Sequence, residues 1–194
     1  MNNRKIIAFS GKATSGKTAA ALLLGKYVMY EGTIFRKISV ADSLRRMTTD
    51  WFPLNIEDLK NRKTEIINLG GRELTIRQVM IELGCKMREI NPDIWVDNMW
   101  KDVELQSQTS SFHAEPPEIL ITIDDIRFPN EYELLKEKGA ILIRIERPGV
   151  DLIDDISETS LDNHEFDHVI QNDGTLDDLS HNIIQCYKQY LTVK

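Results

Sequence analysis

Cysteine and long apolar runs are both scarce in this sequence. The 194 residues contain only Cys85 and Cys186, which lie far apart and match no spacing of metal ligands. This scarcity is typical of a reducing compartment, and a structural zinc site is not expected. No apolar run approaches the ~18 residues of a membrane span, and the N-terminus enters the first expected strand almost at once. We therefore expect a cytoplasmic protein with no membrane partner.

Positive charge is also scarce relative to negative charge. The chain has 24 Lys and Arg residues against 31 Asp and Glu residues, a formal net charge of -7, and its sequence pI is about 5.2. The average field would attract neither nucleic acid nor an anionic membrane, so a general nucleic-acid binder is not expected, although local basic sites stay open. The length suits a single domain, residues 1–194, with room for an inserted lid or cap.

The most informative stretch runs from Gly11 to Thr18 and fits the pattern G-x-x-x-x-G-K-[ST] at every fixed position. Glycines in this pattern let successive backbone N–H groups curl around phosphate oxygens, and Lys17 can neutralise the β and γ charges. The Thr18 hydroxyl can ligate Mg²⁺, and the helix that follows adds its N-terminal dipole. A glycine turn that binds nothing is the alternative. The pattern predicts a phosphate site made of Gly11, Thr14, Ser15, Gly16, Lys17, Thr18 and Ala19.

Strand and helix patterns alternate along the chain. Residues 5–10 have the continuous apolar character of a strand covered on both faces, and residues 17–30 form an Ala- and Leu-rich helix pattern. Residues 51–72 are interpreted as short helices and turns, and 106–118 as an exposed loop. Five strands joined by helical crossovers indicate an α/β fold with a parallel sheet. The other expected strands are 35–40, 119–125, 140–145 and 168–171, and the other expected helices are 75–90, 93–105, 131–138 and 176–191.

Acidic side chains end or follow two of the expected strands. Asp124 and Asp125 are the last residues of the expected strand 119–125, the arrangement by which P-loop enzymes hold Mg²⁺ directly or through water. Asp42 and Arg45 lie just beyond the strand 35–40, at the sheet edge where open α/β sheets bind ligands. Asp42 could instead be only the N-cap of the helix that starts there.

The expected helix 75–90 carries two arginines beside its apolar stripe. At about 100° per residue, Arg77 and Arg88 fall on one line with Gly84 between them. Two arginines that flank a spot without a side chain could grip a ligand. The alternative is that both arginines extend from a core helix into solvent. Trp95 lies in the next expected helix, where a tryptophan is more often a core anchor than a ligand contact.

Arg144 and Arg147 end the expected strand 140–145, just before an acidic segment at 151–165. A lid over residues 147–165 could bring one of these cations onto a bound phosphate, and Arg147 is favoured because it lies nearer Pro148. The alternative is that both arginines are solvated cations paired with nearby acids.

Further motifs extend across most of the chain. Together with the P-loop they resemble the deoxynucleoside monophosphate kinases of bacteriophages, and the later motifs are more specific than the P-loop, which many ATPases share. These motifs are Ala41-Asp42-Ser43-Leu44-Arg45, the spacing from Thr75-Ile76-Arg77 to Gly84, Arg88 and Trp95, Asp125-Ile126-Arg127-Phe128-Pro129-Asn130-Glu131, Ser157-Glu158 and Asn172-Asp173-Gly174-Thr175.

The resemblance implies a P-loop NTPase-type three-layer sandwich with a five-stranded parallel sheet. Its core would comprise residues 1–50 and 117–194, with a helical substrate-binding segment at 51–105 and the lid at 147–165. It also implies that ATP and Mg²⁺ act as cofactors, that the acceptor is a deoxynucleoside 5′-monophosphate, and that the turn with Asn172 and Gly174 lies near the adenine.

Residue roles follow from phosphoryl-transfer physics, in which charge stabilisation and positioning supply most of the rate. Lys17, Arg127 and Arg147 would stabilise the transferring phosphate. Asp42 is the remaining catalytic candidate, although an acceptor phosphate is already ionised and requires no strong base. The residues expected to bind the acceptor are Asp42, Arg45, Arg77, Arg88 and Trp95.

Three alternatives stay open. A small-molecule kinase of the same fold, such as a dephospho-coenzyme A kinase, would need a base for its hydroxyl acceptor, and Asp42 would then be essential. A P-loop ATPase or GTPase would hydrolyse nucleotide without an acceptor. A non-catalytic nucleotide-binding module is disfavoured because Lys17 and Thr18 are intact. Base preference, deoxy or ribo selectivity and oligomeric state, including a homodimer, are left open by the sequence.

Overall fold

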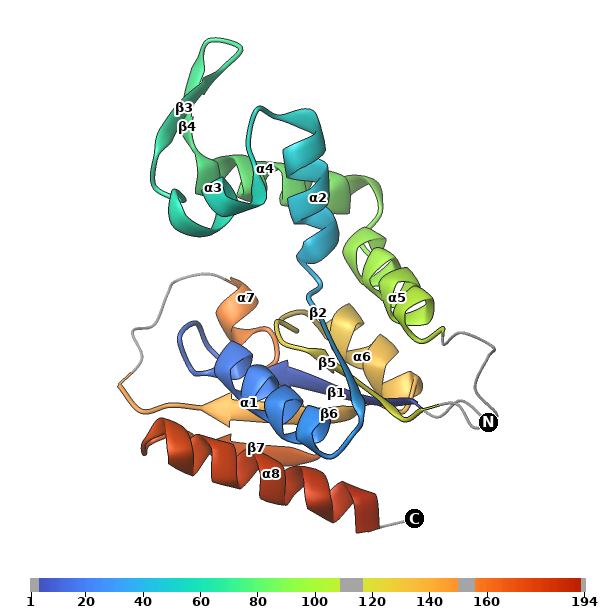
Figure 1. Cartoon of the computed structure of the whole chain (residues 1–194). Helices are drawn as coiled ribbons and strands as arrows, with labels where there is room; N and C mark the ends of the chain where they lie inside the picture. Colours follow the sequence, from blue (N-terminus) through green and yellow to red (C-terminus); the bar gives the residue numbers. More distant parts are fainter. Residues whose placement is uncertain (1–3, 109–116, 150–155, 193–194) are drawn as a thin grey trace. The chain divides into compact units, whose positions relative to one another are not determined.

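The computed structural model describes residues 4–108, 117–149 and 156–192. The chain divides into two compact units, which are described separately (Figure 1). The sheet unit comprises residues 1–39 and 102–194, and the helical unit comprises residues 40–101. Part of the expected loop at 106–118 and part of the expected lid at 147–165 lie outside the described residues.

The sheet unit contains a five-stranded sheet in the order β2-β5-β1-β6-β7, and every adjacent pair is parallel. This arrangement confirms the α/β fold expected from the sequence. The elements of the unit are β1 (Arg4–Ser10), α1 (Lys17–Tyr30), β2 (Ile34–Ile38), β5 (Ile119–Ile123), α6 (Pro129–Glu137), β6 (Ile141–Glu146), α7 (Ile156–Thr159), β7 (His168–Gln171) and α8 (Leu176–Thr192).

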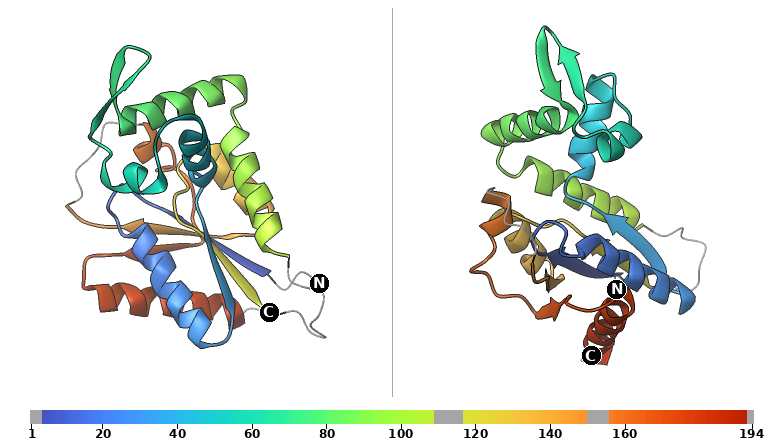
Figure 2. Two further views of the ribbon diagram at one scale, coloured as in Figure 1. Left: turned by 45° about the horizontal axis from the view of Figure 1, so that its top comes forward. Right: turned by 90° about the vertical axis from the view of Figure 1, so that its left-hand side faces the viewer.

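Helices cover both faces of the sheet. Helices α1 and α8 pack on one face and against each other, and α6 lies on the opposite face (Figure 2). The central strands β1 and β5 contain the apolar runs Ile6–Phe9 and Ile119–Ile121, which suit strands buried on both faces. The core between the sheet, α1 and α8 includes Ile7, Phe9, Leu24, Leu120, Ile143, Ile145, Ile183 and Tyr187.

The parallel sheet places the ends of three strands at one edge. The P-loop follows β1, Asp124 follows β5, and Arg147 follows β6. The second strand is shorter than expected, since β2 ends at Ile38 and residues 39 and 40 lie outside it. The carboxyl edge of the sheet is where open α/β folds bind their ligands.

The helical unit is built from α2 (Asp42–Trp51), α3 (Ile56–Asn61), α4 (Ile76–Ile90) and a hairpin of β3 (Ile66–Leu69) and β4 (Arg72–Thr75). Helix α5 (Ile94–Gln106) begins in this unit and ends in the sheet unit. Helix α4 begins with a capping box, because Thr75 Oγ1 accepts a hydrogen bond from the Gln78 backbone N–H at 3.1 Å and Gln78 Oε1 accepts one from the Thr75 N–H at 2.7 Å.

The interpretation of residues 51–72 as only short helices and turns was wrong. Gly70 and Gly71 both have positive φ, 58° and 84°, and together they form the two-residue turn of the hairpin. The strands were missed because Ile66 is 63% exposed, so the hairpin has no clear apolar face. Among the described helices, none is long and apolar enough to cross a membrane.

Candidate active site

The P-loop between β1 and α1 has the backbone that its sequence predicts. Gly11 and Gly16 have φ of 142° and 107°, and Thr14 also has a positive φ, 60°. A Cβ at Gly11 would lie 2.2 Å from the Ile145 carbonyl oxygen, and one at Gly16 would lie 2.5 Å from Asn172 Nδ2. Both positions therefore require glycine for space as well as for conformation.

Lys17 begins α1 and turns its side chain back into the loop. Its Nζ donates hydrogen bonds to the carbonyl oxygens of Gly11 and Lys12, each at 2.6 Å. Burial, together with the nearby Arg127 guanidinium, lowers the Lys17 pKa to about 8, and acidic neighbours led by Glu158 oppose this shift. The ammonium is thus held where a nucleotide phosphate could exchange with the two carbonyls.

Asn172, at the end of β7, supports the loop from behind. Its Nδ2 donates to the Ser15 carbonyl oxygen at 2.8 Å, and its backbone N–H donates to the Glu146 carbonyl oxygen at 2.7 Å. The Ser15 hydroxyl is buried and makes no hydrogen bond with any described residue. Asn172 therefore ties the P-loop to the last two strands of the sheet.

The turn after Asn172 caps the closing helix α8. Asp178 Oδ2 accepts hydrogen bonds from the Thr175 backbone N–H at 2.8 Å and from its hydroxyl at 2.7 Å. A Cβ at Gly174 would lie 2.6 Å from the same Asp178 oxygen. In this structure Gly174 makes room for the cap.

The two carboxylates after β5 differ in their surroundings. Asp124 is 4% exposed, and its Oδ1 accepts a hydrogen bond from Ser39 Oγ at 2.9 Å. Both of its carboxylate oxygens lie 3.3 Å from Lys37 Nζ. Asp125 is half-buried, and Thr18, in the first turn of α1, is exposed. These oxygen donors suit Mg²⁺, which keeps several waters and needs one or two protein ligands.

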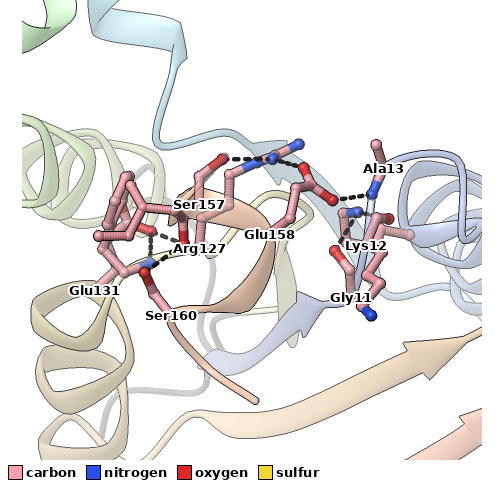
Figure 3. A network of polar contacts seen from close by, with 11 residues as sticks. Gly11, Lys12, Ala13, Arg127, Glu131, Ser157, Glu158 and Ser160 are labelled. Atoms are coloured by element: carbon pink, nitrogen blue, oxygen red, sulfur yellow. Dashed lines mark hydrogen bonds and ion pairs between the residues drawn. The ribbon is translucent and has the colours of Figure 1, made fainter. Parts of the chain in front are cut away.

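Glu158 joins the P-loop to Arg127. The sequence marks it only as part of the Ser157-Glu158 motif and predicts no role for it in the site. Glu158, on α7, accepts a hydrogen bond from the Ala13 backbone N–H at 2.5 Å through Oε2, and its Oε1 pairs with Arg127 Nη1 (Figure 3). The same Nη1 lies 3.2 Å from Ser157 Oγ. Burial would raise the Glu158 pKa, but the bonds from Ala13 and Arg127 outweigh burial and hold it below its usual value.

Arg127 is also fixed through its backbone. Glu131, in the first turn of α6, accepts hydrogen bonds from the backbone N–H groups of Arg127 at 2.7 Å and Phe128 at 3.1 Å through Oε2. The start of the helix thereby sets the direction in which the Arg127 side chain leaves the chain.

A pocket of about 460 Å³ lies beside the P-loop at the ends of β6 and β7. Of its two arginines, Arg144 is already engaged, because it pairs with Asp162 and donates to the Leu161 carbonyl oxygen at 3.1 Å. Arg147 is exposed and lies just beyond the end of β6. The pocket is lined by Lys12, Ser15, Arg144, Ile145, Glu146, Arg147, Pro148, Asp162 and Gln171.

The helical unit holds the other candidates. Asp42 is not the N-cap of α2, which is Ala41, and its Oδ1 lies 2.7 Å from Arg45 Nη1. Both side chains are about one-third exposed. On α4, Arg77 is exposed and Arg88 is half-buried.

The expected open spot between these arginines is absent. Gly84 is buried, and a Cβ there would lie 3.3 Å from Leu44 Cδ2, so α2 fills the space. Trp95 is 3% exposed and donates its Nε1–H to the Gly84 carbonyl oxygen at 3.1 Å. This burial argues against the expected contact of Trp95 with substrate and gives it the role of a core anchor.

A family model described as deoxynucleotide monophosphate kinase matches residues 26–183. The chain belongs to this family. This kinase is therefore a phosphotransferase, as its sequence predicts. A protein of Acanthamoeba polyphaga mimivirus named "Putative deoxynucleotide monophosphate kinase" is 28% identical over 193 residues, which cover 93% of this chain and 95% of the viral protein. The family match begins at residue 26, after the P-loop, so the P-loop pattern and the family match are separate observations.

Solved structures with a similar fold include shikimate kinase from Aquifex aeolicus, with a TM-score of 0.53 and 12% identity over 97% of this kinase and 99% of that chain. Dephospho-CoA kinase from Campylobacter jejuni has a TM-score of 0.51 and 10% identity over 96% of this kinase and 97% of that chain. At such identities the likeness shows the P-loop kinase fold alone.

Proposed function

We propose that this protein transfers the γ-phosphoryl group of ATP to a deoxynucleoside 5′-monophosphate. An oxygen of the acceptor phosphate forms the new bond to the γ-phosphorus, the bond from that phosphorus to the β–γ bridging oxygen breaks, and ADP and a deoxynucleoside diphosphate leave. The observation that carries the proposal is the Lys17 ammonium held inside an intact P-loop, with the Arg127 guanidinium close enough to lower its pKa, in a chain of this family.

The sheet unit supplies the donor side of the site. Lys17 would exchange its two carbonyl partners for β- and γ-phosphate oxygens. The backbone N–H groups of Gly16 and Thr18, at the start of α1, would donate hydrogen bonds to the phosphates. The buried Ser15 hydroxyl, which lacks a partner among the described residues, supports a further polar contact there. Asn172 would act by fixing the loop rather than by touching the phosphates.

Thr18 and Asp125 are the residues that we assign to Mg²⁺. Asp124 is already held by Ser39 and Lys37, so it fits better as a support for the neighbouring Asp125. When bound, Mg²⁺ supplies charge neutralisation on the β- and γ-phosphates. Thr18 and Asp125 fix the ion, and Arg127 acts on the transferring group.

The helical unit would bind the acceptor through its cations. Arg45, Arg77 and Arg88 are suited to the acceptor phosphate, since guanidinium groups bind phosphate oxygens in pairs. Asp42 is engaged by Arg45, and it would orient that arginine or hydrogen-bond the sugar. Arg147, exposed at the pocket beside the P-loop, would serve as a lid cation over ATP.

A coupled assay of ADP release tests this proposal. Purified protein is given ATP, Mg²⁺ and each common deoxynucleoside or ribonucleoside monophosphate, with a reaction lacking acceptor and one containing dephospho-coenzyme A as controls. We expect ADP release that depends on at least one deoxynucleoside monophosphate and a matching diphosphate product. Equal ADP release without acceptor would indicate an ATPase, and activity only with dephospho-coenzyme A would indicate a hydroxyl acceptor.

The acceptor site gives a prediction on α4. We expect Arg77→Ala and Arg88→Ala each to raise the KM for the acceptor about 10-fold or more, because each removes a charge-assisted contact to phosphate. The KM for ATP should stay within about twofold. Lys86→Ala is the matched control, because Lys86 is an exposed cation on the same helix that pairs with Glu89. A loss of thermal stability with unchanged kinetics would support the alternative that these arginines only cover the core helix.

A further inference from the structure

Glu158 is one of the few charged side chains buried at this site. Its side chain is 5% exposed, while that of its partner Arg127 is 32% exposed. The carboxylate bridges two parts of the chain, because one oxygen accepts from the P-loop and the other pairs with the guanidinium (Figure 3). A buried carboxylate is retained at low cost only when both of its oxygens are paired, as they are here.

The geometry of the loop shows how Glu158 is anchored. The Lys12 carbonyl and the Ala13 N–H belong to one peptide group, and these two atoms point in opposite directions in a trans peptide. The carbonyl oxygen accepts from Lys17 Nζ at 2.6 Å, and the N–H donates to Glu158. Glu158 and Lys17 therefore hold the same peptide group of the loop through different atoms.

The contacts of Arg127 leave donors for a ligand. Only Nη1 is used, by Glu158 and Ser157, and among the described residues none accepts a hydrogen bond from its Nε or Nη2. Two like charges, on Arg127 and Lys17, are close enough for Arg127 to lower the Lys17 pKa, and Glu158 opposes that effect. The Glu158 carboxylate, which pairs with Arg127 and raises the Lys17 pKa, offsets part of their repulsion beside the P-loop.

We propose that Glu158 is the positioning residue that docks Arg127 onto the P-loop, so that the free guanidinium donors meet the transferring phosphate. Glu158 acts through Arg127 and touches no substrate itself. This inference rests on the proposed function, because it assigns the cause of Arg127's orientation in the same phosphoryl transfer. Its consequence is that the charge and the reach of Glu158 are both needed for turnover and not for nucleotide affinity.

A double-mutant cycle tests this role. Glu158→Gln keeps an acceptor for the Ala13 N–H but loses the charge, and we expect kcat to fall about 10- to 100-fold, as for a misplaced catalytic group. The Kd of a non-hydrolysable ATP analogue should change less than about threefold. In an Arg127→Ala background the same substitution should lower kcat by less than about twofold, since Glu158 has no guanidinium left to position.

Several outcomes overturn the inference. They are an unchanged kcat in Glu158→Gln, an equal loss in both backgrounds, or a loss that appears in analogue affinity rather than in kcat. Glu158→Asp keeps the charge but is one methylene shorter, and we expect a smaller loss of the same kind. Glu158→Asp replaces Glu158→Gln as the test variant if Glu158→Gln does not fold. A wild-type kcat in Glu158→Asp would also overturn the role.

Glu137→Gln is the matched control, because Glu137 is an exposed carboxylate on α6 whose surface pair is with Lys138. We expect wild-type kcat from it. Wild-type turnover of a deoxynucleoside monophosphate decides the proposed function, and the ratios among the variants decide the role of Glu158. The two can therefore fail separately.

Discussion

Lys17→Ala is expected to lower kcat/KM for phosphoryl transfer by about 10³-fold or more while leaving the protein folded. The ammonium is the main P-loop cation, and without it the β- and γ-phosphate charge is stabilised only by backbone N–H groups and the metal. Stability should change little, because the site lowers the Lys17 pKa to about 8 and therefore disfavours the charged side chain even in the absence of ligand. Coupled ADP-release kinetics and thermal unfolding measure the two effects.

Lys26→Ala is the control for this substitution. Lys26 lies on the exposed side of the same helix α1, so its removal takes away one positive charge without touching the P-loop. We expect wild-type kinetics from Lys26→Ala. Near-normal turnover of Lys17→Ala would contradict the assignment of the phosphate site, and a collapse of its unfolding temperature would show that Lys17 has a structural role.

The strands of the sheet could be predicted from the sequence because each one is an unusual local pattern. The strand His168–Gln171 has the expected bounds, and Ile119–Ile123 starts where expected but ends before the two carboxylates. A continuous apolar run is sufficient to locate the second of these strands. The P-loop was predictable for the same reason, since its glycines, Lys17 and Thr18 lie within eight consecutive positions.

Contacts between distant segments could not be predicted in the same way. Glu158 is 145 positions from the P-loop residue that it binds, and although Ser157-Glu158 is one of the motifs behind the family resemblance, its local sequence does not reveal this partner. Gly84 shows the opposite error, because helical periodicity placed an open spot there and the tertiary packing of Leu44 fills it. A face of one helix can be predicted from the sequence, but the element that covers it cannot.

The same limit applies to Asp124 and Arg144. The sequence places each at the end of a strand, which is where functional side chains gather. In the structure Asp124 is held by Ser39 and Lys37, and Arg144 pairs with Asp162. Both side chains are thus engaged by partners from other strands and loops, which the local sequence does not reveal.

Arg127→Lys is expected to lower kcat about 100-fold or more, with the Kd of a non-hydrolysable ATP analogue within a fewfold of wild type. Lysine can still pair with Glu158, but it is a point charge without the planar fork that places two further donors on a phosphate. Arginines that act on the transferring group in phosphoryl transfer contribute about 10³- to 10⁵-fold, and retention of the charge should preserve part of that effect. Arg36→Lys is the matched control, because Arg36 is exposed on β2 and its Nη1 donates to the adjacent Phe35 carbonyl oxygen, at 3.0 Å. Single-turnover kinetics separate the chemical step from binding. A kcat within about threefold of wild type would remove Arg127 from the chemical step and would leave Lys17 and the metal as its main charges.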